Sequence, residues 1–376
     1  MSDLTFNFTI SKRKADNIAE WIEKHAVLLI VIATTAISIL TWWYFYQNGL
    51  SLAYNDARSH LNIGRRVVEG LKPGFAQIGS VWLPLPHILM IPTIWSDFMW
   101  HTGLSGALQS MIAYVVTGVI IYKYLKYLGV YLGGRLVGVA VFALNLNILY
   151  LQSTAMTELL LLVTMSAGAY YLLKWHKSQQ IFNLIAAAFW IMVSTLVRYD
   201  GWFLFGFAGL LVALQAWRMG RQSWSLRANE EMISLPTQIG DKKDNQQGFF
   251  SRYQLVEGMA LIYASLAALG IGLWFLWNWL IFGDPFYFIF GPFSAHAQQQ
   301  QIEAAGELIT KHNWWLSIKT YLYALMYNSG ALLTLMAFSG AVWLWLDKRL
   351  SSEVRWGSLA LAAPLVFNIL ALYLGH

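Results

Sequence analysis

The segment that decides the fold covers residues 26–46 and reads AVLLIVIATTAISILTWWYFY. It carries no charged residue and has the length of a membrane-spanning helix, which needs about 20 mostly apolar residues. The basic run Lys12-Arg13-Lys14 lies ahead of it. We do not expect a cleaved signal peptide, because the charged lead is long and no small-residue cleavage site follows.

The composition agrees with a chain that faces lipid over most of its surface. Hydrophobic residues make up 57% of the sequence and charged residues 12%, whereas soluble domains carry about 25% charged residues. The 19 tryptophans and 19 tyrosines suit two interfacial aromatic belts. Cysteine is absent, which excludes a disulfide framework, a thiolate metal site and a cysteine nucleophile.

Further apolar segments predict an all-α, polytopic transmembrane bundle of about nine spans. After residues 26–46 they cover 103–122, 136–151, 159–173, 181–197, 202–217, 254–282, 316–346 and 356–376. The apolar stretch 81–100 contains Pro84, Pro86 and Pro92, so we expect a short interfacial or re-entrant segment there. We predict one domain over residues 1–376, and the abrupt end after an apolar helix leads us to expect a missing C-terminal part.

The basic residues orient these spans. With the N-terminus inside, most of the 25 Lys and Arg residues fall in cytoplasmic segments, as the positive-inside rule requires. The outer segments hold the exceptions, Arg58, Arg65, Arg66, Lys72, Arg198, Lys311 and Lys319. The net charge of +6 is therefore a topology signal, and we expect no nucleic-acid partner.

Three long connecting segments follow from this topology. They are a first outer loop over residues 47–103, a polar cytoplasmic loop over 218–252 and a second outer loop over 283–315. In the first, Asn55 or Asp56 can cap a helix that ends near Gly70. Asp56 and His60 are one turn apart on it, and we expect an amphipathic juxtamembrane helix on the membrane surface. The alternative is that Asp56 serves only as the N-cap.

Other acids gather at the outer ends of the predicted spans. Glu158 opens a helix, where the helix dipole alone would favour a carboxylate. Arg198 and Asp200 lie between two spans and could simply extend to the interface, although the arginine fork also suits a phosphate. Asp284 follows a glycine and precedes a proline, a turn signal. We expect these acids to line one outward-facing pocket.

Together these features resemble the GT-C superfamily of membrane glycosyltransferases, in particular the group with protein O-mannosyltransferases and the lipid A aminoarabinose transferase. The resemblance rests on order and placement over residues 26–290. Its parts are Tyr54-Asn55-Asp56, Leu83-Pro84-Leu85-Pro86, Met156-Thr157-Glu158, Arg198 to Trp202 and Asn278 to Phe286.

The resemblance implies an inverting transferase that takes a sugar from a polyprenyl-phosphate donor. The acceptor would be a hydroxyl of a lipid, glycan or protein at the outer face of a bacterial-type plasma membrane. Asp56 would act as general base, with Glu158 as a second catalytic residue that orients the acceptor. Together these two acids could bind a divalent Mg, Mn or Zn ion. The remaining residues expected to bind substrate are Arg58, His60, Arg198, Asp200 and Asp284.

Two other classes of protein compete with this prediction. A transporter or flippase of lipid-linked glycans would place polar sites on broken helices near the bilayer midplane, often within inverted repeats. We find no repeat and almost no charge within the predicted spans. A non-catalytic scaffold for an envelope-assembly complex is the second alternative, and it requires no chemistry from the outer acids.

Overall fold

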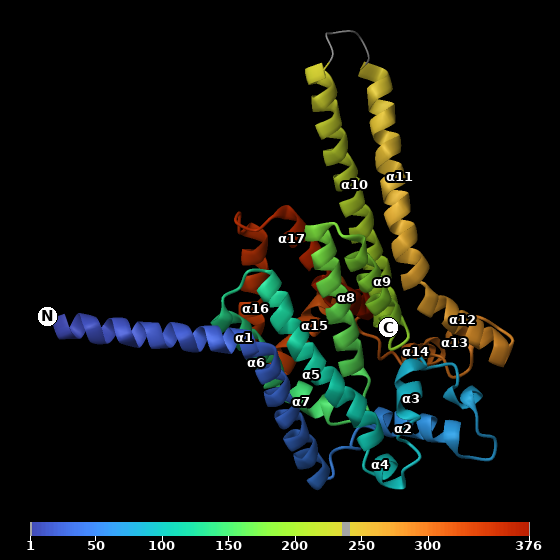
Figure 1. The fold of residues 1–376 in the computed structure, drawn as a ribbon. Helices are drawn as coiled ribbons and strands as arrows, with labels where there is room; N and C mark the ends of the chain where they lie inside the picture. Colours follow the sequence, from blue (N-terminus) through green and yellow to red (C-terminus); the bar gives the residue numbers. More distant parts are fainter. Residues whose placement is uncertain (1, 235–240, 376) are drawn as a thin grey trace. The chain divides into compact units, whose positions relative to one another are not determined.

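The computed structural model describes the backbone of residues 2–234 and 241–375 and the side chains of 17–220 and 253–375. Every regular element in these ranges is an α-helix or a 3₁₀-helix (Figure 1). The predicted all-α class is therefore confirmed for the described chain. The chain divides into two compact units, one of Met1–Gln77 and Pro86–Val163 and one of Ile78–Leu85 and Thr164–His376.

The first unit is built around the N-terminal helix. Residues Ala26 and Ile30 of this helix pack with Tyr122 and Val139 in one buried cluster, and Ser38 donates a hydrogen bond of 2.5 Å to Gln152. The unit contains α1 (Ser2–Gln47), α2 (Asn55–Val68), α4 (Asp97–His101), α5 (Leu104–Tyr127), α6 (Leu132–Ala143) and α7 (Leu146–Gln152), with most of η1 (Phe75–Ile78) and α3 (Leu85–Met90).

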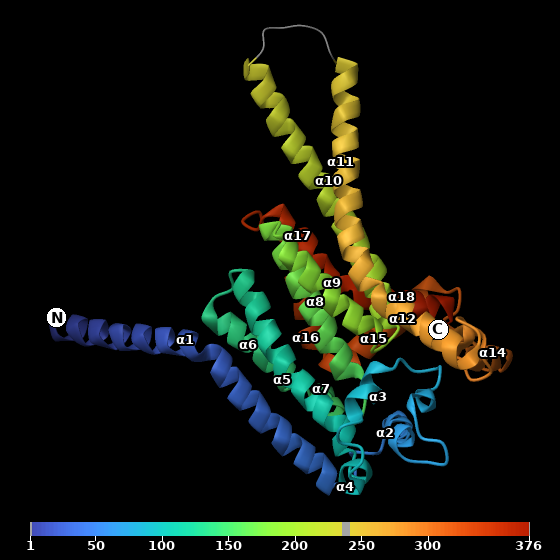
Figure 2. The same ribbon diagram turned by 45° about the vertical axis from the view of Figure 1, so that its right-hand side comes forward.

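The second unit holds the remaining helices. Figures 1 and 2 show α10 and α11 side by side near α9, and all three pack against one another. The elements are α8 (Glu158–Ser178, which begins in the first unit), α9 (Ile181–Thr195), α10 (Asp200–Ser234), α11 (Asp241–Ala267), α12 (Leu269–Phe282), α13 (Tyr287–Phe290), α14 (Ala295–Ala304), α15 (Trp314–Ser329), α16 (Ala331–Leu346), α17 (Ser352–Ser358), η2 (Leu359–Ala362) and α18 (Ala363–Leu374).

Four helical segments are long and apolar enough to cross a membrane, which indicates a membrane protein. They are Asn17–Gln47, Leu104–Tyr127, Asp200–Gly220 and Ser352–Leu374. The number rises to 7 if each of three bent helix pairs counts as one span. Both numbers refer to the described residues and are lower than the nine spans that hydropathy predicts.

The three bent pairs replace predicted straight spans. Segment 136–151 is bent by 61° between α6 and α7, 254–282 by 44° between α11 and α12, and 316–346 by 113° between α15 and α16. The last bend falls at Gly330, whose φ of +85° ends α15, because only glycine adopts such angles readily. At the first, the Asn145 side chain caps the new helix.

The other two predicted spans, 159–173 and 181–197, form α8 and α9. The 15 residues of α9 reach about 22 Å at 1.5 Å per residue, which is short of the ~30 Å hydrocarbon core. The 21 residues of α8 are long enough, but its polar ends keep it outside the candidate spans. These two segments are therefore not among the candidate spans of the described residues.

Two predicted connecting segments also have helical backbone. Segment 81–100 forms the short helices α3 (6 residues) and α4 (5 residues), in agreement with the expected non-spanning element. In the predicted cytoplasmic loop 218–252, α10 continues to Ser234 and α11 starts at Asp241. Residues 235–240 of that loop lie outside the described residues.

The bend at Gly330 leaves two possible paths for the chain. The side of the membrane on which residues 347–350 lie distinguishes between them. Each of α15 and α16 has 16 residues, about 24 Å of helix, so the pair could cross once or return. We expect a single crossing, because Lys348 and Arg349 favour the cytoplasmic side. Since the chain has no cysteine, Lys348→Cys and Glu307→Cys can each be probed with a membrane-impermeant maleimide.

We expect Glu307→Cys to react in intact cells and Lys348→Cys to react only after permeabilisation. Labelling of both cysteines from outside would show that α15 and α16 form a re-entrant hairpin and would contradict the assigned topology.

Candidate functional site

Helix α2 places Asp56 at an exposed helix start. The helix begins at Asn55 with Tyr54 as N-cap, and Tyr54 makes no side-chain cap hydrogen bond. The prediction that Asn55 or Asp56 caps this helix is therefore wrong. Asp56 instead lies in the first turn and is exposed, where the helix dipole favours its negative charge. This position leaves the carboxylate accessible to a bound molecule.

Beyond its first residues, one broad side of α2 is a packing surface. Ala57 and Leu61 are almost completely buried and share one core cluster with Met90, Ile94, Ala155 and Met156. Gly64 faces the same core, since a Cβ at this position would lie at an ordinary contact distance of 3.5 Å from the Met90 side chain. The predicted amphipathic helix is therefore present, with its apolar side turned into the first unit.

His60 lies one turn after Asp56 but in a different environment. Its Nδ1 is 2.9 Å from Nε2 of His87 on α3, and the two residues are only 5% and 0% exposed. One ring must donate and the other accept in this hydrogen bond. The two histidines therefore join α2 to α3 one helical turn after the exposed Asp56.

Arg58 is exposed and holds the chain just before α2. Its Nε donates a hydrogen bond of 2.7 Å to the carbonyl of Leu52. The guanidinium retains further donors on its terminal nitrogens, so an anion near Asp56 could still be bound.

Glu158 begins α8, as the sequence predicts, and is half-buried. The residues just before it are tightly packed: Ser110 donates a hydrogen bond of 3.0 Å to the Met156 carbonyl. A Cβ on Gly106 would lie 2.3 Å from that of Ala155. Because Ala155 and Met156 belong to the same core as α2, the first unit connects the Asp56 helix with the start of the Glu158 helix.

Arg198 and Asp200 belong to the second unit and form an ion pair with each other. Arg198 Nε is 3.3 Å from Asp200 Oδ2, with side chains 39% and 20% exposed. Between them, Tyr199 donates a hydrogen bond of 3.1 Å to the Val81 carbonyl and stacks on Phe288. Burial raises the pKa of the Tyr199 phenol, so it stays protonated as this donor.

Asp284, also in the second unit, has a local structural role. Its Oδ1 accepts a hydrogen bond of 2.9 Å from the backbone of Phe286. Gly283 ends α12 with a φ of +76° directly before it. The predicted turn is thus present, and the Asp284 side chain is hydrogen-bonded within its own loop.

The described side chains add no third protein ligand to the metal site predicted on Asp56 and Glu158. Within residues 17–220 and 253–375, no group of three or more His, Cys, Asp or Glu could hold a metal ion. A divalent ion on Asp56 and Glu158 would need ligands from substrate or water, and it stays a prediction.

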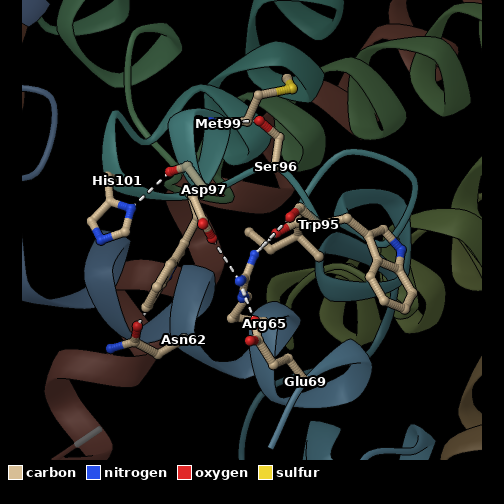
Figure 3. Close-up of polar contacts among 10 residues, drawn as sticks. Asn62, Arg65, Glu69, Trp95, Ser96, Asp97, Met99 and His101 are labelled. Carbon is tan, nitrogen blue, oxygen red and sulfur yellow. Dashed lines mark hydrogen bonds and ion pairs between the residues drawn. The ribbon is translucent and has the colours of Figure 1, made fainter.

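Sequence reasoning missed two residues that position α2. His87 lies between prolines in a short segment that offers no periodicity, so its buried contact with His60 left no local signal. Arg65 was noted only as an outer basic residue, although Figure 3 shows it at the centre of a polar cluster that joins α2 to α4. Both contacts join residues at least 27 positions apart.

Comparison with known proteins gave no relatives. No protein-family model, no curated protein and no solved structure matches this chain significantly.

The packing of α5 against the Glu158 segment yields a stability prediction. Gly106→Ala would force its new Cβ against Ala155, and such overpacking costs about 1–3 kcal/mol. We expect a lower midpoint of thermal unfolding in detergent. The matched control is Gly206→Ala on α10, where a Cβ meets nothing within 4 Å. There we expect no loss, because alanine is a better helix former than glycine. Equal midpoints for both variants would contradict this packing.

Proposed function

We propose that this chain is an integral membrane glycosyltransferase of the GT-C type that uses a polyprenyl-phosphate sugar as donor. The observation that carries the proposal is the placement of Asp56. This carboxylate is exposed in the first turn of an amphipathic helix that directly follows the first candidate span. The order of sequence elements that resembles GT-C enzymes supports the same conclusion.

The proposed reaction is an inverting displacement at the sugar. Asp56 accepts the proton of the acceptor hydroxyl, whose oxygen forms a bond to C1 of the sugar. The bond between C1 and the phosphate oxygen breaks on the opposite face, and polyprenyl phosphate leaves with the electron pair. A base serves this step when it lies within hydrogen-bond reach of the hydroxyl, and the exposed Asp56 carboxylate is open to an approaching acceptor.

Charge stabilisation of the leaving phosphate is the second requirement. Arg58 is exposed two residues after Asp56, and its remaining donors suit phosphate oxygens. Arg198, which pairs with Asp200, is proposed as a further residue that binds the phosphate, and Glu158 as the residue that orients the acceptor. His60 holds α2 against α3 through His87, and Asp284 stabilises the turn after α12. A divalent metal on Asp56 and Glu158 would supply further charge neutralisation.

The proposed setting is a bacterial-type plasma membrane. The N-terminus lies in the cytoplasm and Asp56 faces the periplasm or the outside. This orientation follows from the distribution of Lys and Arg and matches a donor whose lipid tail stays in the bilayer. The acceptor is a lipid, glycan or protein hydroxyl on that face.

Asp56→Asn tests the assignment of the base. The substitution keeps the size of the side chain and removes its basicity, so we expect turnover with polyprenyl-phosphate sugars to fall at least ~100-fold, the usual range for a general base. Sugar transfer by the purified protein in detergent or nanodiscs is the readout. Asp244→Asn, in the predicted cytoplasmic loop, is the matched control and should retain full activity.

Equal turnover of Asp56→Asn and the unmodified protein would remove Asp56 from the mechanism. Unchanged cell-envelope glycans in cells that carry only the Asp56→Asn variant would favour the scaffold alternative.

A second candidate function is transport of a lipid-linked glycan, and the three bent helix pairs favour it. Breaks of 61°, 44° and 113° resemble the discontinuous helices on which transporters build their binding sites. The same reconstituted protein separates the two functions. A transferase releases polyprenyl phosphate, whereas a flippase moves the intact lipid-linked sugar between leaflets.

A further inference from the structure

Among the arginines of the first unit whose side chains the structure describes, Arg65 on α2 makes the most polar contacts. Its Nη1 donates to the carbonyls of Ile94 at 2.8 Å and Trp95 at 2.9 Å. Its Nη2 pairs with Asp97 at 2.7 Å and also with Glu69. The guanidinium carbon lies 4.9 Å from the centre of the Trp100 ring. Figure 3 shows these contacts converging on one side chain.

The cluster joins one side of α2 to the turn before α4. Asn62 and Glu69 lie three residues before and four residues after Arg65, which places all three on one side of the helix. Asn62 accepts a hydrogen bond of 3.3 Å from the Trp100 indole. Across from them, Ser96 caps α4. Two of the groups that Arg65 binds are backbone carbonyls, so its side chain ties α2 to the main chain of the turn before α4.

Arginine suits this task better than lysine. The Arg65 side chain is 13% exposed, and its planar fork reaches two carbonyls and two carboxylates at once while it stacks on an indole. A lysine ammonium is a single point charge and would satisfy only part of this set. The partner carboxylates are 73% and 61% exposed, so each ion pair alone contributes little. The preference for arginine over lysine at this position therefore comes from the geometry of all these contacts together.

Arg65 thus completes the attachment of the helix that carries Asp56. The apolar side of α2 packs on Met90 and Ile94, and His60 binds His87 near its middle. Arg65 holds the C-terminal half. A helix held along its length presents its first turn in a fixed position, and catalytic groups must be held within about 0.5 Å of their working geometry.

We propose that Arg65 is a positioning residue for the reaction: its clamp on the 94–97 turn sets the orientation of α2 and therefore the place of Asp56. This inference rests on the proposed function for its effect on turnover, while the fixing of α2 can be measured without substrate. Arg65 touches neither donor nor acceptor in this proposal and acts only through α2.

The first test measures the mobility of α2 directly. The cysteine-free chain allows spin labels at Asn55→Cys on α2 and Ile112→Cys on α5, two exposed positions of the first unit. We expect a narrow distribution of label distances in the full-length protein and a broader one when Arg65→Lys is added. Arg66→Lys makes the same change at the next residue, which is exposed, and should leave the distribution narrow.

The second test measures turnover in the same variants. We expect Arg65→Lys to lower kcat at least ~10-fold, since small misplacements of catalytic groups cost up to ~100-fold. KM for the donor should change less than about threefold, because the residue does not bind it. Arg66→Lys should retain the kinetics of the unmodified protein.

The possible outcomes separate the two hypotheses. An unchanged distance distribution in Arg65→Lys overturns the positioning role, and so does a broadened distribution with unchanged kcat. Absence of transfer by the unmodified protein overturns the proposed function, while the distance measurement still decides whether Arg65 fixes α2.

Discussion

Hydrocarbon offers no hydrogen-bond partner for a peptide group, and this constraint shapes the molecule. A chain with 57% hydrophobic and 12% charged residues can satisfy its backbone in lipid only as helices or a closed barrel, and every regular element of the described residues is helical. Asp56, Glu158 and Asp200 each lie in the first turn of a helix, where the N-terminal dipole favours a carboxylate. These three acids of the proposed site therefore all lie where helices begin.

Helix α2 differs from the candidate spans because it is amphipathic and is held on both its buried and its polar side. Its buried side shares the core of Met90 and Ile94, and its polar side holds the α4 turn through Arg65. Gly106 lets the segment before Glu158 approach α5 closely. Rigid support of this kind is what an exposed acid needs if it is to act as a base at a fixed point. The account of function thus depends less on Asp56 alone than on the contacts that hold its helix.

Hydropathy and capping signals predicted the helical class, the four candidate spans and α2 nearly to its ends, because these depend on residues close in sequence. The breaks at Gly330 and Asn145 were not predicted. Each has a local signal in the sequence, a glycine after Asn328-Ser329 that ends α15 and an asparagine that caps α7. The contacts of His60 with His87 and of Arg65 with Asp97 join residues 27 and 32 positions apart, and no periodicity marks such pairs. The turn at Asp284 followed its local signal. The sugar-transfer chemistry came from a resemblance in motif order and remains a proposal.

The most direct measurement follows the oxygen that links the sugar to the phosphate. The purified protein in nanodiscs would receive a polyprenyl-phosphate sugar with ¹⁸O in this bridging position, together with acceptor hydroxyls. Our account predicts that the bond from C1 to this oxygen breaks, that ¹⁸O is recovered in free polyprenyl phosphate, and that the product has the inverted anomeric configuration. Recovery of intact labelled donor, moved to the other leaflet without release of polyprenyl phosphate, would contradict it.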